Sequence, residues 1–433
     1  MSTQRSPEDH GLLRFTTCGS VDDGKSTLIG RLLYDTRSIL ADTLHAIERT
    51  SQKRGLGAVD LSLLTDGLQA EREQGITIDV AYRYFSTGTR KYIIADAPGH
   101  EQYTRNMVTA ASTASLAIIL IDARKGVLPQ TRRHSYITKL VGIPHVVAAV
   151  NKMDLVGYDQ TVFDRIVADY TAFAASAGIT DVRFIPMSAL DGAMVVERGD
   201  VMPWYTGPTL LDVLEAVPAA STEDGASLRF PVQYVCRVHD EGLGEGVGVD
   251  ASRAGAGYRG FAGRVEGGEV APGDRVVVLP SGRETTVKSV ELGGVALAKG
   301  VAEQSVTLVL DEEVDISRGD MIAHAGDAPE GRKQIDAMVC WLSETPLDRA
   351  RKYLIRHTTR ETKAAVASIA YRIDVRTAEE QPATELRMND IARVSFKLAQ
   401  PVFSDPYRVN RATGAFIVID ESTNNTVGAG MIL

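Results

Sequence analysis

The chain carries Gly19-Ser20-Val21-Asp22-Asp23-Gly24-Lys25-Ser26 near its N-terminus, a full match to the phosphate-loop pattern G-x-x-x-x-G-K-[ST]. Residues 12–18 before it read as a strand and residues 26–33 after it as a helix, which is the setting that this pattern requires. In such a loop backbone N–H groups converge on phosphates, the lysine adds a positive charge and the serine hydroxyl can ligate Mg²⁺. Residues Gly19 to Thr27 therefore predict a nucleoside triphosphate site, and a chance glycine turn is the weaker alternative.

From residue 12 to about residue 217, apolar strand patterns alternate with helical patterns. This alternation is typical of a mostly parallel sheet with helices on both faces. Strands are expected at residues 12–18, 91–96, 116–122, 146–151 and 182–186. Ligands bind outside the carboxyl ends of the strands in such a sheet. We therefore expect Asp96, Asn151 and Ser188 at the same edge as the phosphate loop.

The rest of the chain changes character after a small, polar run at residues 219–230, which reads as a linker. Short β-rich runs separated by Gly, Pro and Asp follow, and they predict two small β-barrels. The predicted domains are an α/β phosphate-loop domain at residues 1–222, a first barrel at residues 223–330 and a second barrel at residues 331–433. Residues 238–257 are expected to form a loop inserted in the first barrel, and no function is assigned to it.

The 433-residue chain is 44% hydrophobic and 24% charged, which is typical of a globular protein with two or three domains. Its formal net charge of −9 argues against broad binding to nucleic acids or anionic membranes, because both depend on a positive field. The three cysteines are far apart and indicate neither a disulfide framework nor a C-x-x-C metal site. No apolar leader or membrane span is evident. We therefore expect a cytoplasmic protein without nucleic-acid or membrane partners.

The choice of base is indicated by Asn151-Lys152-Met153-Asp154, at the end of a predicted buried strand. The Asp154 carboxylate can accept both N1–H and the exocyclic N2–H of guanine, which adenine does not present. Asn151 can bond the purine edge and fix the loop, and the Lys152 stem can cover the ring face. An ordinary N-K-x-D turn is the weaker alternative beside a phosphate loop. A later strand is followed by Ser188-Ala189-Leu190, which can present a backbone N–H to guanine O6.

A hydrolysis switch is indicated by Asp96-Ala97-Pro98-Gly99-His100, which follows the strand at residues 91–96. Asp96 can reach Mg²⁺ through a water, and the Gly99 N–H can contact a γ-phosphate. His100 is predicted to orient the attacking water, with a buried structural histidine as the alternative. Upstream, Thr77 can close over Mg²⁺ when the γ-phosphate is present.

Taken in this order, the motifs G-S-V-D-D-G-K-S, G-I-T-I, D-A-P-G-H, N-K-M-D and S-A-L resemble the translation-factor class of GTPases. Longer runs, at residues 66–85, 121–133, 202–205, 315–320 and 425–431, are similar to the GTP-binding large subunits of bacterial sulfate adenylyltransferases. The resemblance implies a G domain followed by two β-barrels, with GTP and Mg²⁺ as cofactors. It also implies that GTP hydrolysis drives a reaction on a smaller, adenylyl-transferring partner subunit. There ATP and sulfate would form adenosine 5′-phosphosulfate and pyrophosphate.

The same resemblance implies a role for each residue that matches the family's motifs. Phosphates and Mg²⁺ would be bound by Lys25, Ser26, Thr77, Asp96 and Gly99. Guanine would be bound by Asn151, Lys152 and Asp154, and the attacking water would be positioned by His100.

Two positions of the phosphate loop depart from the translation factors, which usually have histidines where this chain has Ser20 and Asp23. This departure favours the sulfate-activating branch. The alternative is an elongation-factor-like GTPase that carries aminoacyl-tRNA, and its support is the basic segment at residues 348–360. Alternation places Lys352 and Arg356 on one strand face and Tyr353 on the other, which favours a solvated outer face. A phosphate-loop kinase or ATPase is disfavoured by N-K-M-D.

Overall fold

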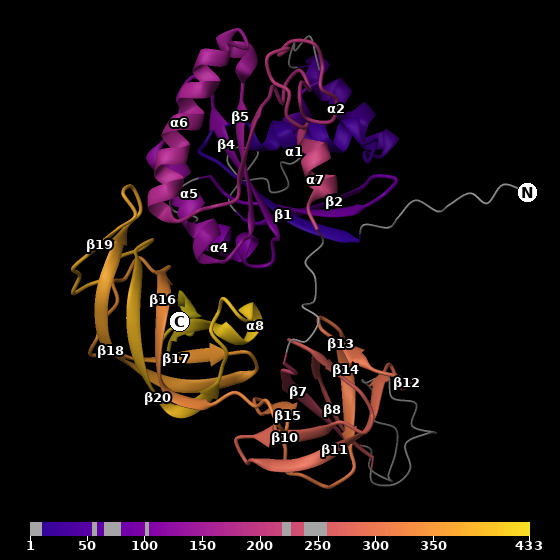
Figure 1. The fold of residues 1–433 in the computed structure, drawn as a ribbon, viewed down its shortest axis with the longest axis vertical. Helices are drawn as coiled ribbons and strands as arrows, with labels where there is room; N and C mark the ends of the chain where they lie inside the picture. Colours follow the sequence, from indigo (N-terminus) through magenta and orange to yellow (C-terminus); the bar gives the residue numbers. More distant parts are fainter. Residues whose placement is uncertain (1–10, 54–58, 65–78, 100–103, 219–226, 238–257) are drawn as a thin grey trace, which may run out of the picture. The chain divides into compact units, whose positions relative to one another are not determined.

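The structure is a computed structural model that describes residues 11–53, 59–64, 79–99, 104–218, 227–237 and 258–433 (Figure 1). The chain divides into two compact units, of which one holds residues 1–220 and the other nearly all of residues 221–433. Thr77, His100 and the predicted loop at residues 238–257 lie outside the described residues. None of the helices in the described ranges combines the length and the hydropathy that crossing a membrane requires.

The first unit is built on a six-stranded sheet with the order β2-β3-β1-β4-β5-β6. Neighbouring strands run parallel, except that β2 and β3 are antiparallel. The strands are β1 (Leu12–Cys18), β2 (Ala81–Ser86), β3 (Lys91–Asp96), β4 (Leu116–Asp122), β5 (His145–Asn151) and β6 (Val182–Pro186). All of β4 is buried, as expected for a central strand covered on both faces. The edge strand β2 was not predicted, because only Phe85 in it is buried and no apolar run marks it.

Helices cover both faces of this sheet (Figure 1). They are α1 (Lys25–Asp35), α2 (Ala41–Lys53), α4 (Thr104–Ser112), α5 (Pro129–Leu140), α6 (Gln160–Ala177) and α7 (Leu210–Ala216), with the 3₁₀ turns η1 (Leu61–Leu64) and η3 (Met153–Val156). The helix α6 begins where the Asp159 side chain accepts a hydrogen bond from Thr161 N, and it ends at Gly178 in the left-handed conformation. The predicted α/β domain, with a mostly parallel sheet, is confirmed.

The first barrel of the second unit closes through six strands in the order β10-β15-β7-β8-β14-β11, because β10 also pairs with β11. Its elements are β7 (Phe230–Arg237), β8 (Arg259–Arg264), β9 (Glu269–Val270), β10 (Arg275–Leu279), β11 (Arg283–Leu292), β12 (Val295–Leu297), β13 (Gly300–Val301), β14 (Ser305–Leu310) and β15 (Met321–His324). Alternate residues of these strands, such as Phe230, Phe261 and Leu308, fill the barrel interior.

The second barrel closes in the same way, in the order β17-β21-β22-β16-β20-β18 with β17 paired to β18. Its elements are β16 (Gly331–Trp341), β17 (Lys352–His357), β18 (Arg360–Asp374), β19 (Glu379–Gln381), β20 (Ile391–Phe403), α8 (Arg411–Gly414), β21 (Ala415–Asp420) and β22 (Thr426–Ile432). The prediction of two barrels after an α/β domain is therefore confirmed. The boundaries at residues 222–223 and 330–331 stay predictions.

A buried ion pair lies at the seam between the two barrels. Arg229 donates from Nε and Nη2 to the two carboxylate oxygens of Asp405, at 2.8 and 2.9 Å. Its Nη1 donates to Leu228 O and Asp327 O, and Thr413 Oγ1 donates to Asp405 Oδ2 at 2.7 Å. Only 5% of the Arg229 side chain and 13% of the Asp405 side chain are exposed. The chain itself therefore supplies the partners of both buried charges.

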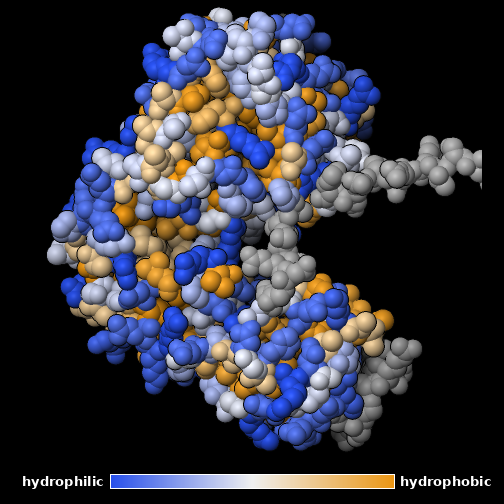
Figure 2. Space-filling view, in the orientation of Figure 1, coloured by the Kyte–Doolittle hydropathy of each residue, from blue (hydrophilic) through white to orange (hydrophobic). Residues whose placement is uncertain are grey.

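Hydrophobic residues also reach the surface of both units. Figure 2 shows them in patches between hydrophilic residues on the face that is drawn. Leu40 and Tyr84 in the first unit, and Val295 and Val409 in the second, are more than half exposed. Scattered exposure of this kind is ordinary in globular proteins and identifies no site by itself.

Candidate nucleotide-binding site

The phosphate loop connects β1 to α1 with two residues in the left-handed region. Asp22 has a φ of 66° and Gly24 a φ of 93°. A Cβ at Gly24 would lie 2.5 Å from Asn151 Nδ2, so both the backbone conformation and the close approach require glycine. Asp23 is buried, and its Oδ2 accepts a hydrogen bond from Ser20 N at 2.6 Å. Contacts within the protein thus fix the conformation of the loop without a ligand.

Lys25 is a buried cation at the start of α1, only 7% exposed. Its Nζ donates to Gly19 O at 3.0 Å and to Ser20 O at 3.2 Å. No ion pair to Lys25 is found among the described residues, and burial lowers the pKa of its ammonium group. A buried charge is costly unless a charged partner compensates it. The ammonium group therefore fits an anion such as a phosphate.

Asp96 and Gly99 lie beside Lys25 after the end of β3. Asp96 is buried, interacts electrostatically with Lys25 and accepts a hydrogen bond from Thr17 Oγ1 at 3.2 Å. A Cβ at Gly99 would lie 2.5 Å from Lys25 Nζ. The structure therefore brings these switch residues to the edge of the phosphate loop, as the strand-end argument predicts. Their roles toward a nucleotide stay predictions.

The oxygen groups near the phosphate loop suit a hard cation rather than a dedicated protein cage. The described residues contain no group of three His, Cys, Asp or Glu side chains that could hold a metal. Ser26 is half-buried in the first turn of α1, and Asp96 offers a carboxylate. Mg²⁺ usually takes one or two such ligands and completes its shell with phosphates and waters. The residues present therefore fit Mg²⁺ bound together with a nucleotide.

Asn151 ties the phosphate loop to the segment Ser188-Ala189-Leu190. Its Nδ2 donates to Asp23 O at 2.8 Å, and its Oδ1 accepts from Ala189 N at 2.9 Å. The next residue, Lys152, has a φ of 62° and donates from Nζ to Asp22 O. Two neighbouring residues of the base motif thus hold two neighbouring carbonyls of the phosphate loop. The two predicted motifs form one structural unit.

Asp154 lies in η3 and is half-buried. Among the described residues its carboxylate forms neither a hydrogen bond nor an ion pair, although Arg124 and Tyr158 interact with it electrostatically. Both carboxylate oxygens are therefore available as acceptors. That is the property which N1–H and N2–H of guanine require.

The segment at residues 188–190 is held from two sides. Ser188 Oγ accepts a hydrogen bond from Asp191 N at 3.1 Å. From α1, Arg31 donates Nε to Ala189 O at 3.2 Å and Nη2 to Leu190 O. The helix after the phosphate loop therefore also positions this segment.

Sequence reasoning missed Arg31, Asp122 and Arg124, which support the predicted site residues. Asp122 ends β4 and accepts hydrogen bonds from Arg124, and its Oδ2 lies 3.1 Å from Lys152 Nζ. Its signal was present, because an acidic residue ends this strand just as Asp96 ends β3. Arg31 had no signal, since its partners lie more than 150 residues further along the chain.

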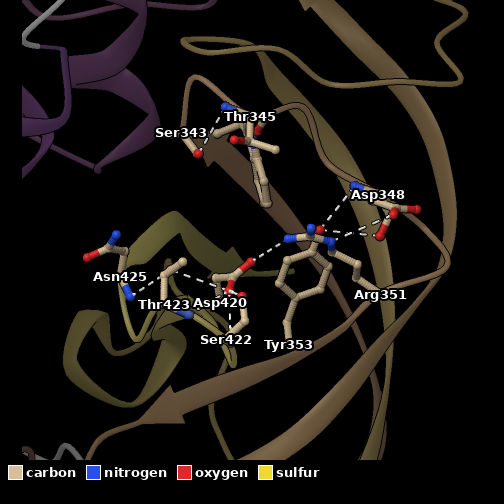
Figure 3. A network of polar contacts seen from close by, with 10 residues as sticks. Ser343, Thr345, Asp348, Arg351, Tyr353, Asp420, Ser422, Thr423 and Asn425 are labelled. Atoms are coloured by element: carbon tan, nitrogen blue, oxygen red, sulfur yellow. Dashed lines mark hydrogen bonds and ion pairs between the residues drawn. The ribbon is translucent and has the colours of Figure 1, made fainter.

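Three arginines of the basic segment at residues 348–360 form ion pairs within the second unit. Arg351 donates to Asp420 Oδ2 at 2.9 Å and lies 3.8 Å from Asp348 Oδ2 (Figure 3). Further ion pairs are Arg356–Glu361 and Arg360–Asp320. Lys352 and Arg356 are exposed and Tyr353 is buried, which confirms the predicted alternation. These contacts favour a structural role for the segment over binding of RNA phosphates.

Comparison with known proteins gives the same assignment. Residues 10–219 match the family model described as Elongation factor Tu GTP binding domain, and residues 334–433 match that of the GTP-eEF1A C-terminal domain-like family. Sulfate adenylyltransferase subunit 1 of Cellvibrio japonicus is 53% identical over 428 residues, which are 98% of this chain and 87% of that protein. The protein of the same name from Bacteroides fragilis is 50% identical, with 98% and 87% covered.

A third relative is larger. The bifunctional enzyme CysN/CysC of Mycobacterium tuberculosis is 49% identical over 424 residues, which are 98% of this chain and 67% of that protein. With identities near 50% along almost its whole length, the chain belongs to the family of sulfate adenylyltransferase subunit 1, the GTPase subunits built on a translation-factor-type GTP-binding domain.

Proposed function

We propose that GTP hydrolysis on the first unit drives the formation of adenosine 5′-phosphosulfate and pyrophosphate from ATP and sulfate, in sulfate assimilation. The observation that carries the choice of GTP is the state of the base motif. Asn151 and Lys152 are occupied in holding the phosphate loop, whereas Asp154 keeps its carboxylate available. The choice of reaction rests on the names of the relatives.

In this proposal the phosphates bind to the backbone N–H groups of residues 19–27 and to the Lys25 ammonium group. Phosphate oxygens would replace the carbonyls that Lys25 now contacts and form charge-assisted hydrogen bonds with its ammonium group. The Gly99 N–H would meet a γ-phosphate, and the support for this role is that Gly99 lies beside Lys25 Nζ. Guanine binds between Asp154 and the segment at residues 188–190, with the Lys152 stem across the ring.

Ser26, Thr77 and Asp96 would hold Mg²⁺, directly or through water. When bound, Mg²⁺ neutralises charge that develops on the phosphoryl oxygens. His100 is assigned the task of orienting the attacking water. His100→Ala is therefore expected to keep GTP binding and to slow hydrolysis by about 100-fold or more, as expected for loss of a proton-transfer or water-orienting group. Single-turnover hydrolysis beside equilibrium binding measures both, and turnover at the wild-type rate would remove this role.

A smaller partner subunit is proposed to carry the ATP and sulfate site. Hydrolysis can drive an unfavourable reaction only if each site changes the other, which is a coupling free energy between two sites. GTP turnover should therefore be slow until the partner has bound both of its substrates. We place the complex in the cytoplasm, because none of Cys18, Cys236 and Cys340 forms a disulfide, as expected in a reducing compartment.

The test is to co-purify the chain with the adenylyl-transferring subunit and to measure GTP consumption. Turnover should rise when ATP and sulfate are added together, and adenosine 5′-phosphosulfate should accumulate with it. Either substrate alone should have little effect. A complex that forms adenosine 5′-phosphosulfate equally well without GTP would contradict the proposal. GTP-dependent capture of aminoacyl-tRNA would instead support an elongation-factor-like role.

A further inference from the structure

Asp122 is a fully buried carboxylate at the end of β4, next to the predicted base motif. Its side chain is 0% exposed. Arg124 donates to it three times, from N and Nε to Oδ1 at 3.0 Å each and from Nη2 to Oδ2 at 2.6 Å. Although burial alone would raise it, these bonds and Lys152 hold the pKa of Asp122 well below its usual range. Asp122 is therefore ionised and rigidly held.

Lys152 is the third group on this carboxylate. Its Nζ lies 3.1 Å from Asp122 Oδ2 and also donates to Asp22 O in the phosphate loop. Its backbone is in the left-handed region, with a φ of 62°, where a non-glycine residue needs support from its surroundings. The ammonium group is thus fixed at both sides, and the direction of the stem between Cα and Nζ is fixed with it.

We propose that Asp122, held by Arg124, is a positioning residue for guanine nucleotides that acts through Lys152. The Asp122 carboxylate fixes the Lys152 ammonium group. The four-carbon stem of Lys152 is therefore already extended along the position that the guanine ring would take. Nucleotide binding then does not have to immobilise a flexible lysine, a cost that preorganisation avoids. The inference rests on the proposed binding of guanine at residues 151–154.

The second barrel provides a matched control for the local geometry. At the end of β18, Asp374 accepts from Arg376 N at 2.9 Å and Arg376 Nε at 3.3 Å, and its Oδ2 accepts from Arg376 Nη2 at 3.1 Å. In both places an aspartate accepts hydrogen bonds from the arginine two positions later, but of the two aspartates Lys152 contacts only Asp122. If Asp122 only closed a local turn, the two aspartates should respond alike to substitution.

The experiment measures GDP and GTP dissociation constants and steady-state GTP hydrolysis of the complex for Asp122→Asn and Asp374→Asn. For Asp122→Asn we expect dissociation constants and KM about tenfold higher with kcat changed less than twofold, because a hydrogen bond to a charged group is lost. Asp374→Asn should bind like the wild type. Equal behaviour of the two variants, or a fall in kcat without a change in KM, would overturn the proposal.

A double-mutant cycle tests whether the effect passes through Lys152. In a Lys152→Met background, Asp122→Asn should weaken binding no further, whereas full additivity would overturn the proposal. If Asp122→Asn does not fold, Arg124→Gln replaces it, since it keeps the carboxylate and should raise the dissociation constant about threefold. The proposed function fails separately, if the wild type does not prefer GTP to ATP.

Discussion

Lys25 in the phosphate loop and Arg229 at the barrel seam are both buried cations, and they differ in what surrounds them. Arg229 donates two hydrogen bonds to the Asp405 carboxylate, and its third guanidinium nitrogen donates to two backbone carbonyls. Lys25 contacts two carbonyls and, among the described residues, forms no ion pair. Both cations are removed from water, but the protein provides an ion-pair partner for Arg229 and, among the described residues, none for Lys25.

The difference separates structural from functional charge. A buried pair whose members both come from the chain is complete when the protein folds, so it holds elements together. A buried charge without an ion-pair partner keeps part of its interaction energy for a ligand of opposite sign. Substituting each cation should consequently damage different properties of the molecule.

The largest effect is expected for Arg229→Met. It leaves the Asp405 carboxylate buried and unpaired, which costs about 3–5 kcal/mol of unfolding free energy in comparable cases. GTP binding should be unchanged. Denaturant unfolding followed by Trp341 fluorescence, in a Trp204→Phe background, reports on the barrels. Arg356→Met is the control, because the exposed Arg356–Glu361 pair should contribute no more than about 1 kcal/mol. Equal losses for both arginines would remove the distinction.

Lys25→Met should have the opposite result, with weaker GTP binding and nearly unchanged stability. Loss of charge-assisted hydrogen bonds to phosphate is expected to weaken GTP binding by about 100-fold or more, at roughly 1.5–3 kcal/mol for each such bond. The free energy of unfolding without nucleotide should stay within about 1 kcal/mol of the wild type, since no ion pair is broken. Calorimetric titration and denaturant unfolding check the two halves. The exposed Lys91 supplies the control variant, Lys91→Met.

Asp154→Asn tests whether the Asp154 carboxylate, like the Lys25 ammonium group, is kept for the ligand. One acceptor oxygen is replaced by an amide that cannot accept from guanine N2–H, so GTP affinity should fall by about 1–3 kcal/mol. Xanthosine triphosphate, which has a carbonyl at that ring position, should bind better to the variant than to the wild type. Competition binding against labelled GDP measures both changes. An unaltered preference for GTP would show that Asp154 does not contact the base.

The smallest effect concerns pH at the seam. Burial lowers the pKa of His357, which donates from Nε2 to Thr413 O at 2.6 Å. Because the folded pKa lies below the unfolded value of 6.5, the unfolded chain binds the extra proton first as pH falls. The contribution of His357 to the free energy of unfolding is therefore complete above pH 6.5. It falls toward lower pH by at most about 1.4 kcal/mol per pH unit.

Unfolding of the barrels at about pH 7 and about pH 5.5 measures this slope, which spans the range where a histidine normally titrates. His357→Gln should reduce the slope, while His45→Gln, at a side chain that is 66% exposed, should not. A slope that persists in His357→Gln would assign it to another group. Nucleotide affinity does not depend on the seam, so it should match that of the wild type in both variants.

Much of the fold could be predicted because its signals are local. The strands at residues 12–18, 91–96, 116–122 and 182–186 have in the structure the bounds that the sequence predicts, since each is a short apolar run. The phosphate loop and base motif could be placed at one sheet edge by the strand-end rule. What that rule could not show is that Asn151 bonds Asp23 O, 128 residues earlier in the chain.

Other features have no local signal. Arg229 and Asp405 are 176 residues apart, and nothing near either residue indicates the other. The closing pairs β10–β11 and β17–β18 likewise follow from barrel geometry rather than from any one strand. The strand β2 lacks an apolar run because it lies at the sheet edge.

The sequence by itself determined the chemistry that is available: a phosphate loop at residues 19–26, the guanine-type motif at residues 151–154 and two β-rich halves after them. Only the tertiary structure decided which buried charges are satisfied. Asp405 reaches Arg229 across the barrel seam, and Asp122 reaches Lys152, whereas Lys25 and Asp154 are left with capacity for a ligand. The physical reason is that burial and pairing belong to neighbours in space, and those neighbours are far apart along the chain.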